Sequence, residues 1–191
     1  MAEHIVTYRG TVYPWHCDQM GHMNVMWYVG KFDEATWQLF SAAGITPSYL
    51  RSQRRGMVAV DQRLSYRGEL YAGDVISVRS AIIELGTSSV RFVHEMQRDE
   101  TGEHVATSML KGVHIDTVAR RSCPLPEEQR VAACRLVVAD ASAWEGWPPP
   151  ALSSADGSET VMLTAGDSGQ DERCSRAPLG AVPRGAGARN E

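Results

Sequence analysis

The side chains best suited to chemistry are concentrated in one short connection, residues 15–28, which reads WHCDQMGHMNVMWY. A carboxylate, Asp18, is followed there by Gly21, His22 and Asn24. The connection directly precedes a segment with helical spacing, where unpaired N–H groups and the positive end of the helix stabilise negative charge. Acyl transfer to water needs a base or nucleophile, together with donors aimed at the developing oxyanion. The loop is therefore suited to that chemistry.

Each of these side chains also has an ordinary structural explanation. An Asp before a helix is often only an N-cap, and a His in that place is as often a cap or a packed residue as a catalyst. Asn24 could cap the helix, hold an attacking water or orient the Asp18 carboxylate, since an amide both donates and accepts. If Asp18 were inert, Glu34 would be the next candidate carboxylate.

A metal site is the remaining reading of the loop, with His16, Asp18 and His22 as ligands. Two His and one carboxylate in a short loop lack a supporting cluster elsewhere in the chain, so we expect no metal. Gly21 is expected to let the chain turn sharply and let a substrate approach the backbone amides.

The elements that must position this loop follow from periodicity. Residues 4–13 alternate as a strand, and residues 26–43 place apolar side chains at helical spacing before the stop at Gly44. Four later runs alternate with period two, at residues 57–66, 75–85, 89–98 and 104–116. Turn residues divide these runs into hairpins. The order predicts an α+β fold in which an antiparallel sheet is covered by the one long helix.

Composition narrows the function classes. Residues 1–135 hold 15 basic and 15 acidic residues, while residues 136–191 hold 4 and 8. A neutral body does not suit a nucleic-acid binder. No run approaches the roughly 20 apolar residues of a membrane span, and the first residues do not resemble a secretion signal. The four cysteines form no C-x-x-C pair. We therefore expect a cytoplasmic protein that contacts neither nucleic acid nor membrane.

The chain divides into a predicted domain at residues 1–135 and a low-complexity extension at residues 136–191. The extension is rich in Pro, Gly, Ser and Ala, which predicts disorder. Trp144 and Trp147, beside a run of three prolines, offer the alternative that this segment docks on the domain or on a partner.

The loop resembles the D-x-x-G-H-x-N-x-x-Y signature of the 4-hydroxybenzoyl-CoA thioesterase-like branch of the hotdog superfamily. Every signature position matches, from Asp18 to Tyr28, and the resemblance covers roughly residues 3–125. It implies a five-stranded antiparallel sheet wrapped around one long central helix. It also implies hydrolysis of acyl-CoA to free acid and CoA, with Asp18 as general base or nucleophile. The backbone amides of Val25 and of nearby loop residues such as Gly21 would form the oxyanion hole.

The same resemblance suggests how the substrate is held. His22 and Asn24 match branch members that act on acyl-CoA or acyl-carrier-protein thioesters, and both are candidate catalytic residues. The predicted substrate-binding residues are Tyr28, Arg91, Lys111 and Arg120, although each of the three basic residues could equally be an ordinary surface charge. Coenzyme A is part of the substrate, so we expect no cofactor.

Two features remain open from sequence. A five-stranded sheet covered by one helix leaves strand edges unpaired, which predicts a homodimer or homotetramer. A hotdog domain that binds acyl-CoA or acyl-carrier-protein thioesters without turnover is the alternative function, although such a protein has no need for Asp18. An enoyl-CoA hydratase-like reaction is a weaker alternative, because members of that group carry a different loop pattern.

Overall fold

The computed structural model describes residues 4–138 as a single sheet with a long helix against it. The elements, in chain order, are β1 (Ile5–Thr11), the 3-10 helix η1 (Pro14–His16), α1 (Val25–Ala42), α2 (Pro47–Gln53), β2 (Arg55–Tyr66), β3 (Val75–Leu85), β4 (Ser89–Arg98), β5 (His104–Asp116), β6 (Arg121–Ser122) and α3 (Glu127–Cys134). The predictions for residues 139–191, including Trp144 and Trp147, lie outside the described residues.

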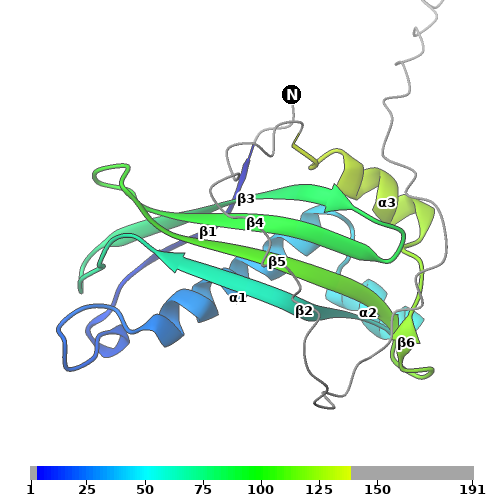
Figure 1. Ribbon diagram of the computed structural model, residues 1–191, viewed down its shortest axis with the longest axis horizontal. Helices are drawn as coiled ribbons and strands as arrows, with labels where there is room; N and C mark the ends of the chain where they lie inside the picture. Colours follow the sequence, from blue (N-terminus) through cyan, green and yellow to red (C-terminus); the bar gives the residue numbers. More distant parts are fainter. Residues whose placement is uncertain (1–3, 139–191) are drawn as a thin grey trace, which may run out of the picture.

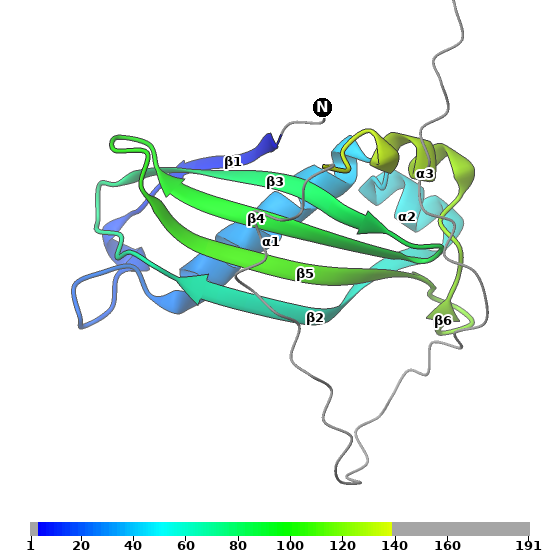
Figure 2. The ribbon, with the colours of Figure 1, turned by 45° about the horizontal axis from the view of Figure 1, so that its top comes forward.

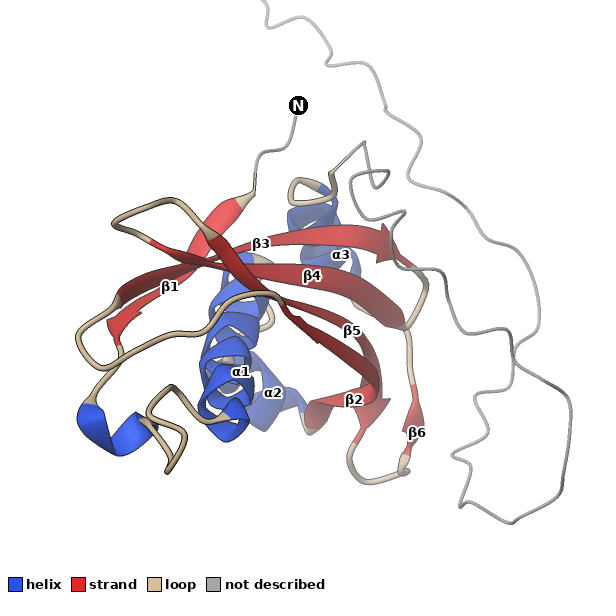
Figure 3. Cartoon of the chain, turned by 60° about the vertical axis from the view of Figure 1, so that its left-hand side comes forward, coloured by secondary structure: helices blue, strands red, loops and turns tan. Residues whose placement is uncertain are grey.

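The sheet is antiparallel throughout, in the order β1-β3-β4-β5-β2, with β6 paired to the end of β5. Figures 1 and 3 show the strands curving around α1, which lies along one face of the sheet. The predicted α+β arrangement of one antiparallel sheet around one long helix is confirmed. The last three predicted strands have the bounds expected from their alternation, and β2 begins two residues before its expected start.

The apolar stripe of α1 explains why the sheet wraps around it. Tyr28, Phe32, Ala35 and Leu39 recur at helical spacing and are all buried. The first three pack with Val78 and other strand residues near the start of the helix, and Leu39 belongs to a second cluster near its end. Burying a side chain of the size of Phe32 or Leu39 stabilises the fold by about 1.5–3 kcal/mol. This packing fixes the direction in which α1 presents its N-terminus.

Besides η1, three short elements were not predicted from the sequence. The first, α2, begins at Pro47 after Thr46, whose side-chain oxygen accepts a hydrogen bond from the N–H of Tyr49 at 3.1 Å. Thr46 as a cap followed by Pro47 is a helix start that was not used to predict α2. The other two, β6 and α3, are only 2 and 8 residues long, which leaves little periodicity to detect.

The chain continues past Arg135 along β3. The N–H of Ile82 donates to the carbonyl of Leu136 at 3.2 Å, and the N–H of Val138 donates to the carbonyl of Ile82 at 3.0 Å. Val138 is buried against the sheet. The folded body therefore includes residues 136–138, which the sequence analysis had placed in the extension.

A buried polar chain links α1 to three strands. The Oγ1 of Thr36 donates to the carbonyl of Phe32 at 2.9 Å and lies 2.9 Å from the Nε2 of His94. The hydroxyl proton of Thr36 is already donated to Phe32, so the Nε2 of His94 must carry a proton and donate it to Thr36. The Nδ1 of His94 then accepts a hydrogen bond from Ser80, 2.5 Å away. Ser80 in turn bonds Thr7 of β1. Burial lowers the pKa of His94 to about 3, so the ring is neutral in the folded protein.

We predict that His94 makes stability depend on pH. Between an unfolded pKa of 6.5 and a folded pKa of about 3, the unfolded chain binds a proton that the folded chain excludes. The free energy of unfolding should therefore fall as pH falls through this window, by up to about 1.4 kcal/mol per pH unit. Urea unfolding of the protein and of His94→Gln at several pH values isolates this contribution. Equal slopes in the two proteins would contradict it.

Candidate active site

The connection that precedes α1 forms a tight turn centred on Gly21. The N–H of Asp18 donates to the carbonyl of His22 at 3.2 Å, and the N–H of Gly21 donates to the carbonyl of Asp18 at 3.0 Å. Gly21 has φ 86°, a left-handed conformation that glycine adopts without strain. Cys17 and Met23 pair across the turn. The turn folds the Asp18 side chain back toward the start of the helix.

The Asp18 carboxylate is held by two donors. The N–H of Met20 donates to Oδ1 at 2.9 Å, and the Asn24 amide donates to Oδ2 at 2.9 Å. The N–H of Met20, and then the Asn24 amide, hold the pKa of Asp18 below its usual range. A carboxylate in this state is ionised at neutral pH and can act as a base or a nucleophile.

Asn24 also starts α1. Its Oδ1 accepts a hydrogen bond from the N–H of Met26 at 3.0 Å, and its carbonyl accepts one from the N–H of Trp27 at 2.9 Å. The N–H of Val25 has no acceptor among the described residues. It is therefore a free donor at the positive end of the helix, close in sequence to the residue that holds Asp18. The N–H of Gly21, by contrast, is engaged within the turn.

A second segment, between β2 and β3, holds the loop in place. The N–H of Met23 donates to the carbonyl of Leu70 at 2.7 Å. The Nε2 of His22 lies 3.7 Å from Oε1 of Glu69, and the Tyr71 hydroxyl donates to Oε2 of Glu69 at 2.6 Å. Glu69 is a site residue that sequence reasoning missed. No local sequence pattern indicates a role for Glu69, because only the tertiary fold brings it close to the loop.

Of the predicted substrate-binding residues, Tyr28 lies nearest the loop. It is buried, its hydroxyl donates to the carbonyl of Gly68 at 3.2 Å, and burial raises its pKa to about 12. This hydrogen bond fastens α1 to the segment just after β2. Arg91 and Lys111 are neighbours across β4 and β5 on the face of the sheet opposite α1, and Arg91 pairs with Glu84 at 3.3 Å.

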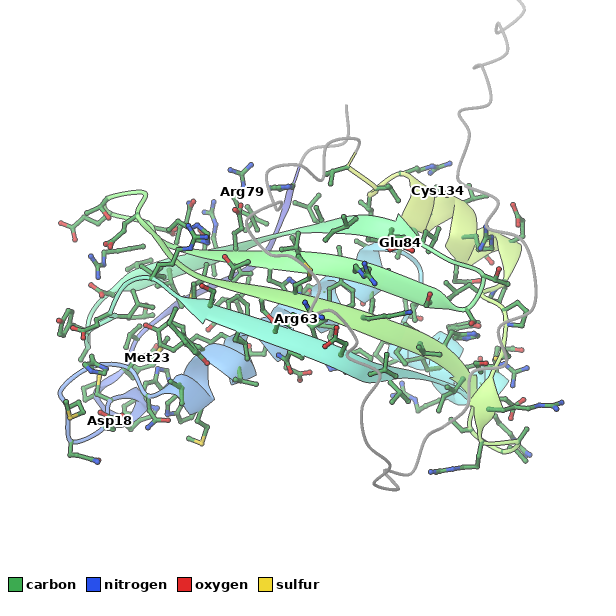
Figure 4. All side chains as sticks on the ribbon, in the orientation of Figure 1. Asp18, Met23, Arg63, Arg79, Glu84 and Cys134 are labelled. Atoms are coloured by element: carbon green, nitrogen blue, oxygen red, sulfur yellow. The ribbon has the colours of Figure 1, made fainter. Side chains whose placement is uncertain are left out.

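Arg120 lies in the turn between β5 and β6, at the end of the sheet opposite Asp18. Figures 1 and 2 show β6 and the blue loop before α1 at opposite ends of the molecule, and Figure 4, in the orientation of Figure 1, labels Asp18 in that loop. The structure therefore gathers Asp18, His22, Asn24 and Val25 into one site, and it places the three basic candidates elsewhere in the same chain. Their roles in binding substrate stay predictions.

The His16 ring is packed into the structure. Its ring lies 4.2 Å from the Trp27 ring, and its Nδ1 accepts a hydrogen bond from the N–H of Tyr13 at 3.0 Å. Burial, and then the charge of Lys31, lowers the pKa of His16. Within residues 4–138, no three His, Cys, Asp or Glu side chains are grouped so that they could hold a metal ion. No helix in this range is long and apolar enough to cross a membrane.

A curved antiparallel sheet around α1, with a carboxylate loop at the start of that helix, defines a hotdog-fold protein. The chain belongs to the thioesterase-like superfamily, whose family profile matches residues 12–133. The membership predicted from the loop signature is thus confirmed at the level of the superfamily.

Solved structures share this fold. A hypothetical protein from Staphylococcus aureus in complex with CoA superposes with a TM-score of 0.66 at 18% identity, over 78% of this chain and 92% of that chain. A 1,4-dihydroxy-2-naphthoyl-CoA thioesterase from Synechocystis superposes with a TM-score of 0.61 at 20% identity, over 68% of this chain and 95% of that chain.

A curated relative is the L-carnitine dehydrogenase/betainyl-CoA thioesterase of Agrobacterium fabrum (strain C58). It is 28% identical over 109 residues, which are 57% of this chain. The chain spans only 22% of the length of that relative.

We predict that the Asn24 amide helps to hold the pKa of Asp18 below its usual range. Asn24→Ser keeps an oxygen that can cap α1 but removes the amide donor, so the pKa of Asp18 should rise while the helix start is retained. The pKa of Asp18 is measured by NMR titration of its side-chain carboxyl carbon. Gln19→Ala, an exposed change in the same loop, is the control and should leave this pKa in place. An unchanged pKa in Asn24→Ser would show that the amide does not act on the carboxylate.

Proposed function

We propose that the protein hydrolyses acyl-CoA thioesters to a free acid and CoA. The observation that carries this proposal is the ionised Asp18 carboxylate, which is held 2.9 Å from the Asn24 amide while the same side chain caps α1. Asn24 directly precedes Val25, whose free N–H at the same helix start is the proposed oxyanion donor. Membership of the thioesterase-like superfamily supports the choice of a thioester as the bond that is broken.

The reaction can follow two routes from this geometry. As a base, Asp18 takes a proton from water while the oxygen attacks the carbonyl carbon. As a nucleophile, it attacks that carbon itself and forms a mixed anhydride that water then opens. In both routes the N–H of Val25 stabilises the oxyanion, the C–S bond breaks and CoA leaves as a thiol. After a single turnover in ¹⁸O-water, label in Asp18 identifies the nucleophilic route, because Asp18 takes up ¹⁸O only when water opens the anhydride at the Asp18 carbonyl carbon.

A pair of exposed aromatic side chains is suited to contact the acyl group of the substrate. Tyr13 and Trp15, just before Asp18 in the chain, stack with ring centroids 4.6 Å apart and are 47% and 66% exposed. Such faces suit an apolar acyl group, and they also suit a quaternary ammonium through cation–π attraction. The substrate panel should therefore add betainyl-CoA, which the Agrobacterium relative is named for, and its neutral isostere 3,3-dimethylbutanoyl-CoA, to aliphatic and aromatic acyl-CoAs.

The working unit is proposed to be a homodimer joined through β2. This strand is 12 residues long and ends the sheet formed by residues 4–138, within which it pairs with β5 alone. Long unpaired edges invite pairing with another chain. Its exposed side chains include the apolar Val60 and Tyr66.

We predict that Asp18→Asn abolishes turnover without changing the fold. The amide is isosteric but has no charge with which to activate water or attack the carbonyl, so kcat/KM should fall at least about a hundredfold. Thiol release from the acyl-CoA panel is followed with a chromogenic disulfide, and circular dichroism confirms folding. Glu34→Gln, an exposed carboxylate on α1, is the matched control and should keep its activity.

The outcomes of this comparison are distinct. Equal activity in Asp18→Asn and the unmodified protein would move the chemistry to another residue, with Glu34 tested in the same experiment. Release of no CoA from any acyl-CoA would overturn acyl-CoA hydrolysis and favour a binding domain without turnover.

The dimer yields its own prediction. Val60→Glu places a charge at the middle of the β2 edge and should halve the mass measured by light scattering, from about two copies of 21.0 kDa to one. Val131→Glu is the matched control, since Val131 is 45% exposed on α3 and Val60 is 53% exposed. A monomeric unmodified protein would contradict the dimer, and a dimeric Val60→Glu would move the interface away from β2.

A further inference from the structure

Lys31, on α1, is buried without a carboxylate partner. The residue is 4% exposed. Its Nζ donates a hydrogen bond to the Tyr8 hydroxyl at 2.9 Å and lies 5.1 Å from the centre of the Tyr8 ring. None of the Asp and Glu side chains in residues 4–138 forms an ion pair with it. Lysine is seldom buried unless it is paired, because a buried charge loses its hydration. Packing alone therefore does not explain this residue.

The strand β1 holds the Lys31 ammonium in a fixed place. A Cβ at residue 10 would meet the Tyr8 hydroxyl too closely, so the Tyr8 ring keeps its position only because residue 10 is glycine. The Tyr8 hydroxyl oxygen accepts from Nζ, and an aromatic ring attracts a cation at this distance. Because β1 and α1 lie against each other, both contacts define where the charge sits.

The charge of Lys31 acts on the His16 ring, which is also buried, at 6% exposure. The rings of Tyr13 and Trp15, from its own segment, and of Trp27, from α1, surround the His16 ring. No Asp or Glu side chain in residues 4–138 forms an ion pair with it. Burial, and then the charge of Lys31, lowers the pKa of His16. Both causes favour an uncharged ring.

The hydrogen bond of His16 requires that uncharged state. Its Nδ1 accepts from the N–H of Tyr13 at 3.0 Å, so the proton of the neutral ring is on Nε2. A proton on Nδ1 as well would set one N–H against the N–H of Tyr13 and leave both without an acceptor. Buried donors without acceptors are costly. A charged ring would therefore move away from its place 4.2 Å from the Trp27 ring.

The position of His16 is coupled to Asp18 through Asn24. The carbonyl of His16 accepts a hydrogen bond from the N–H of Asn24 at 2.9 Å. The Asn24 amide donates to the Asp18 carboxylate at 2.9 Å, and the Asn24 oxygen caps α1. A His16 residue displaced from its packing would move this carbonyl, and with it the side chain that orients the carboxylate.

We propose that Lys31 is a positioning residue whose buried ammonium keeps His16 uncharged and thereby holds the Asp18 loop in the arrangement that hydrolyses the thioester. This inference rests on the proposed function. At about 1.5 Å per residue, Lys31 lies roughly 9 Å along α1 from Val25, so it acts through His16 and not on the reacting carbonyl. As pH falls through the pKa of His16, the loop loses its anchor and activity falls. The charge of Lys31 moves that loss to lower pH.

The first test removes the charge and keeps the length of the side chain. In Lys31→Met the pKa of His16 should rise, because one of the two causes that lower it is lost. The ratio of kcat/KM at about pH 8 to kcat/KM at about pH 5.5 should become at least about threefold larger than in the unmodified protein. Arg79→Met, at an exposed arginine on β3, is the control for a lost positive charge and should leave the ratio unchanged. A loss of kcat/KM by the same factor at both pH values would overturn the proposal, since that result marks a structural effect.

The second test asks whether Lys31 acts through His16. The side-chain oxygen of asparagine can accept the N–H of Tyr13 but does not titrate, so His16→Asn keeps the acceptor and removes the switch. In the His16→Asn background, adding Lys31→Met should change the pH ratio less than about 1.5-fold. A threefold increase in this background would overturn His16 as the group through which Lys31 acts. Lys31→Gln, whose amide can still bond the Tyr8 hydroxyl, repeats both comparisons with a smaller change in packing, and circular dichroism verifies the fold of each variant.

Failure of this inference is distinguishable from failure of the proposed function. NMR titration of the ring protons in the full chain gives the pKa of His16 without any turnover, and the signals lost in His16→Asn identify that ring. An unchanged pKa of His16 in Lys31→Met would overturn the inference while leaving acyl-CoA hydrolysis intact. If no acyl-CoA is hydrolysed, the proposed function fails, and the side-chain amide signal of Asn24 then decides whether the loop responds to His16. That signal should shift with the pKa of His16, and a signal that stays constant would overturn the coupling.

Discussion

The Asn24 side chain is the contact on which the arrangement of the site depends. Its oxygen accepts from the N–H of Met26 and so starts α1, while its amide donates to Asp18 at 2.9 Å. One planar group therefore fixes the carboxylate relative to the helix axis. The free N–H of Val25 is the next residue along the chain, so the donor and the carboxylate keep their relation as long as Asn24 is in place. An oxyanion site needs this fixed relation, because donors that reorganise during the reaction stabilise charge poorly.

The rest of the fold keeps that contact rigid. The buried stripe of α1 prevents the helix from rotating against the sheet, and the chain from His94 to Thr36 adds a directional bond at mid-helix. The segment after β2 holds the loop from the other side, through Leu70 to Met23 and through Glu69 to His22. A loop tied to both the helix and the sheet loses little entropy when substrate binds, which favours catalysis.

Sequence reasoning succeeded where a pattern is local. Alternation gave β3, β4 and β5 with their bounds, and the loop signature led to the hotdog fold and its superfamily. It failed for α2, although Thr46 and Pro47 form a recognisable helix start, and for α3, which is too short for its period to show. Glu69 was missed for a deeper reason. Its nearness to His22 depends on how β2 and α1 pack, and the residues around Glu69 in the sequence show no pattern from which that packing could be predicted.

The single chain leaves Asp18 with a lowered pKa, which bears on how the reaction proceeds. Donors from Met20 and Asn24 stabilise the charged form, and a carboxylate that is so well stabilised is a weak base. A second subunit and a bound acyl group would remove water from the site, and desolvation acts in the opposite direction by raising the pKa. Desolvation already opposes the two donors in the single chain, and its effect on the pKa would grow when the site is closed. The carboxylate would then stay ionised in the free enzyme and become more basic once the thioester is in place, which ties the strength of the base to occupancy of the site.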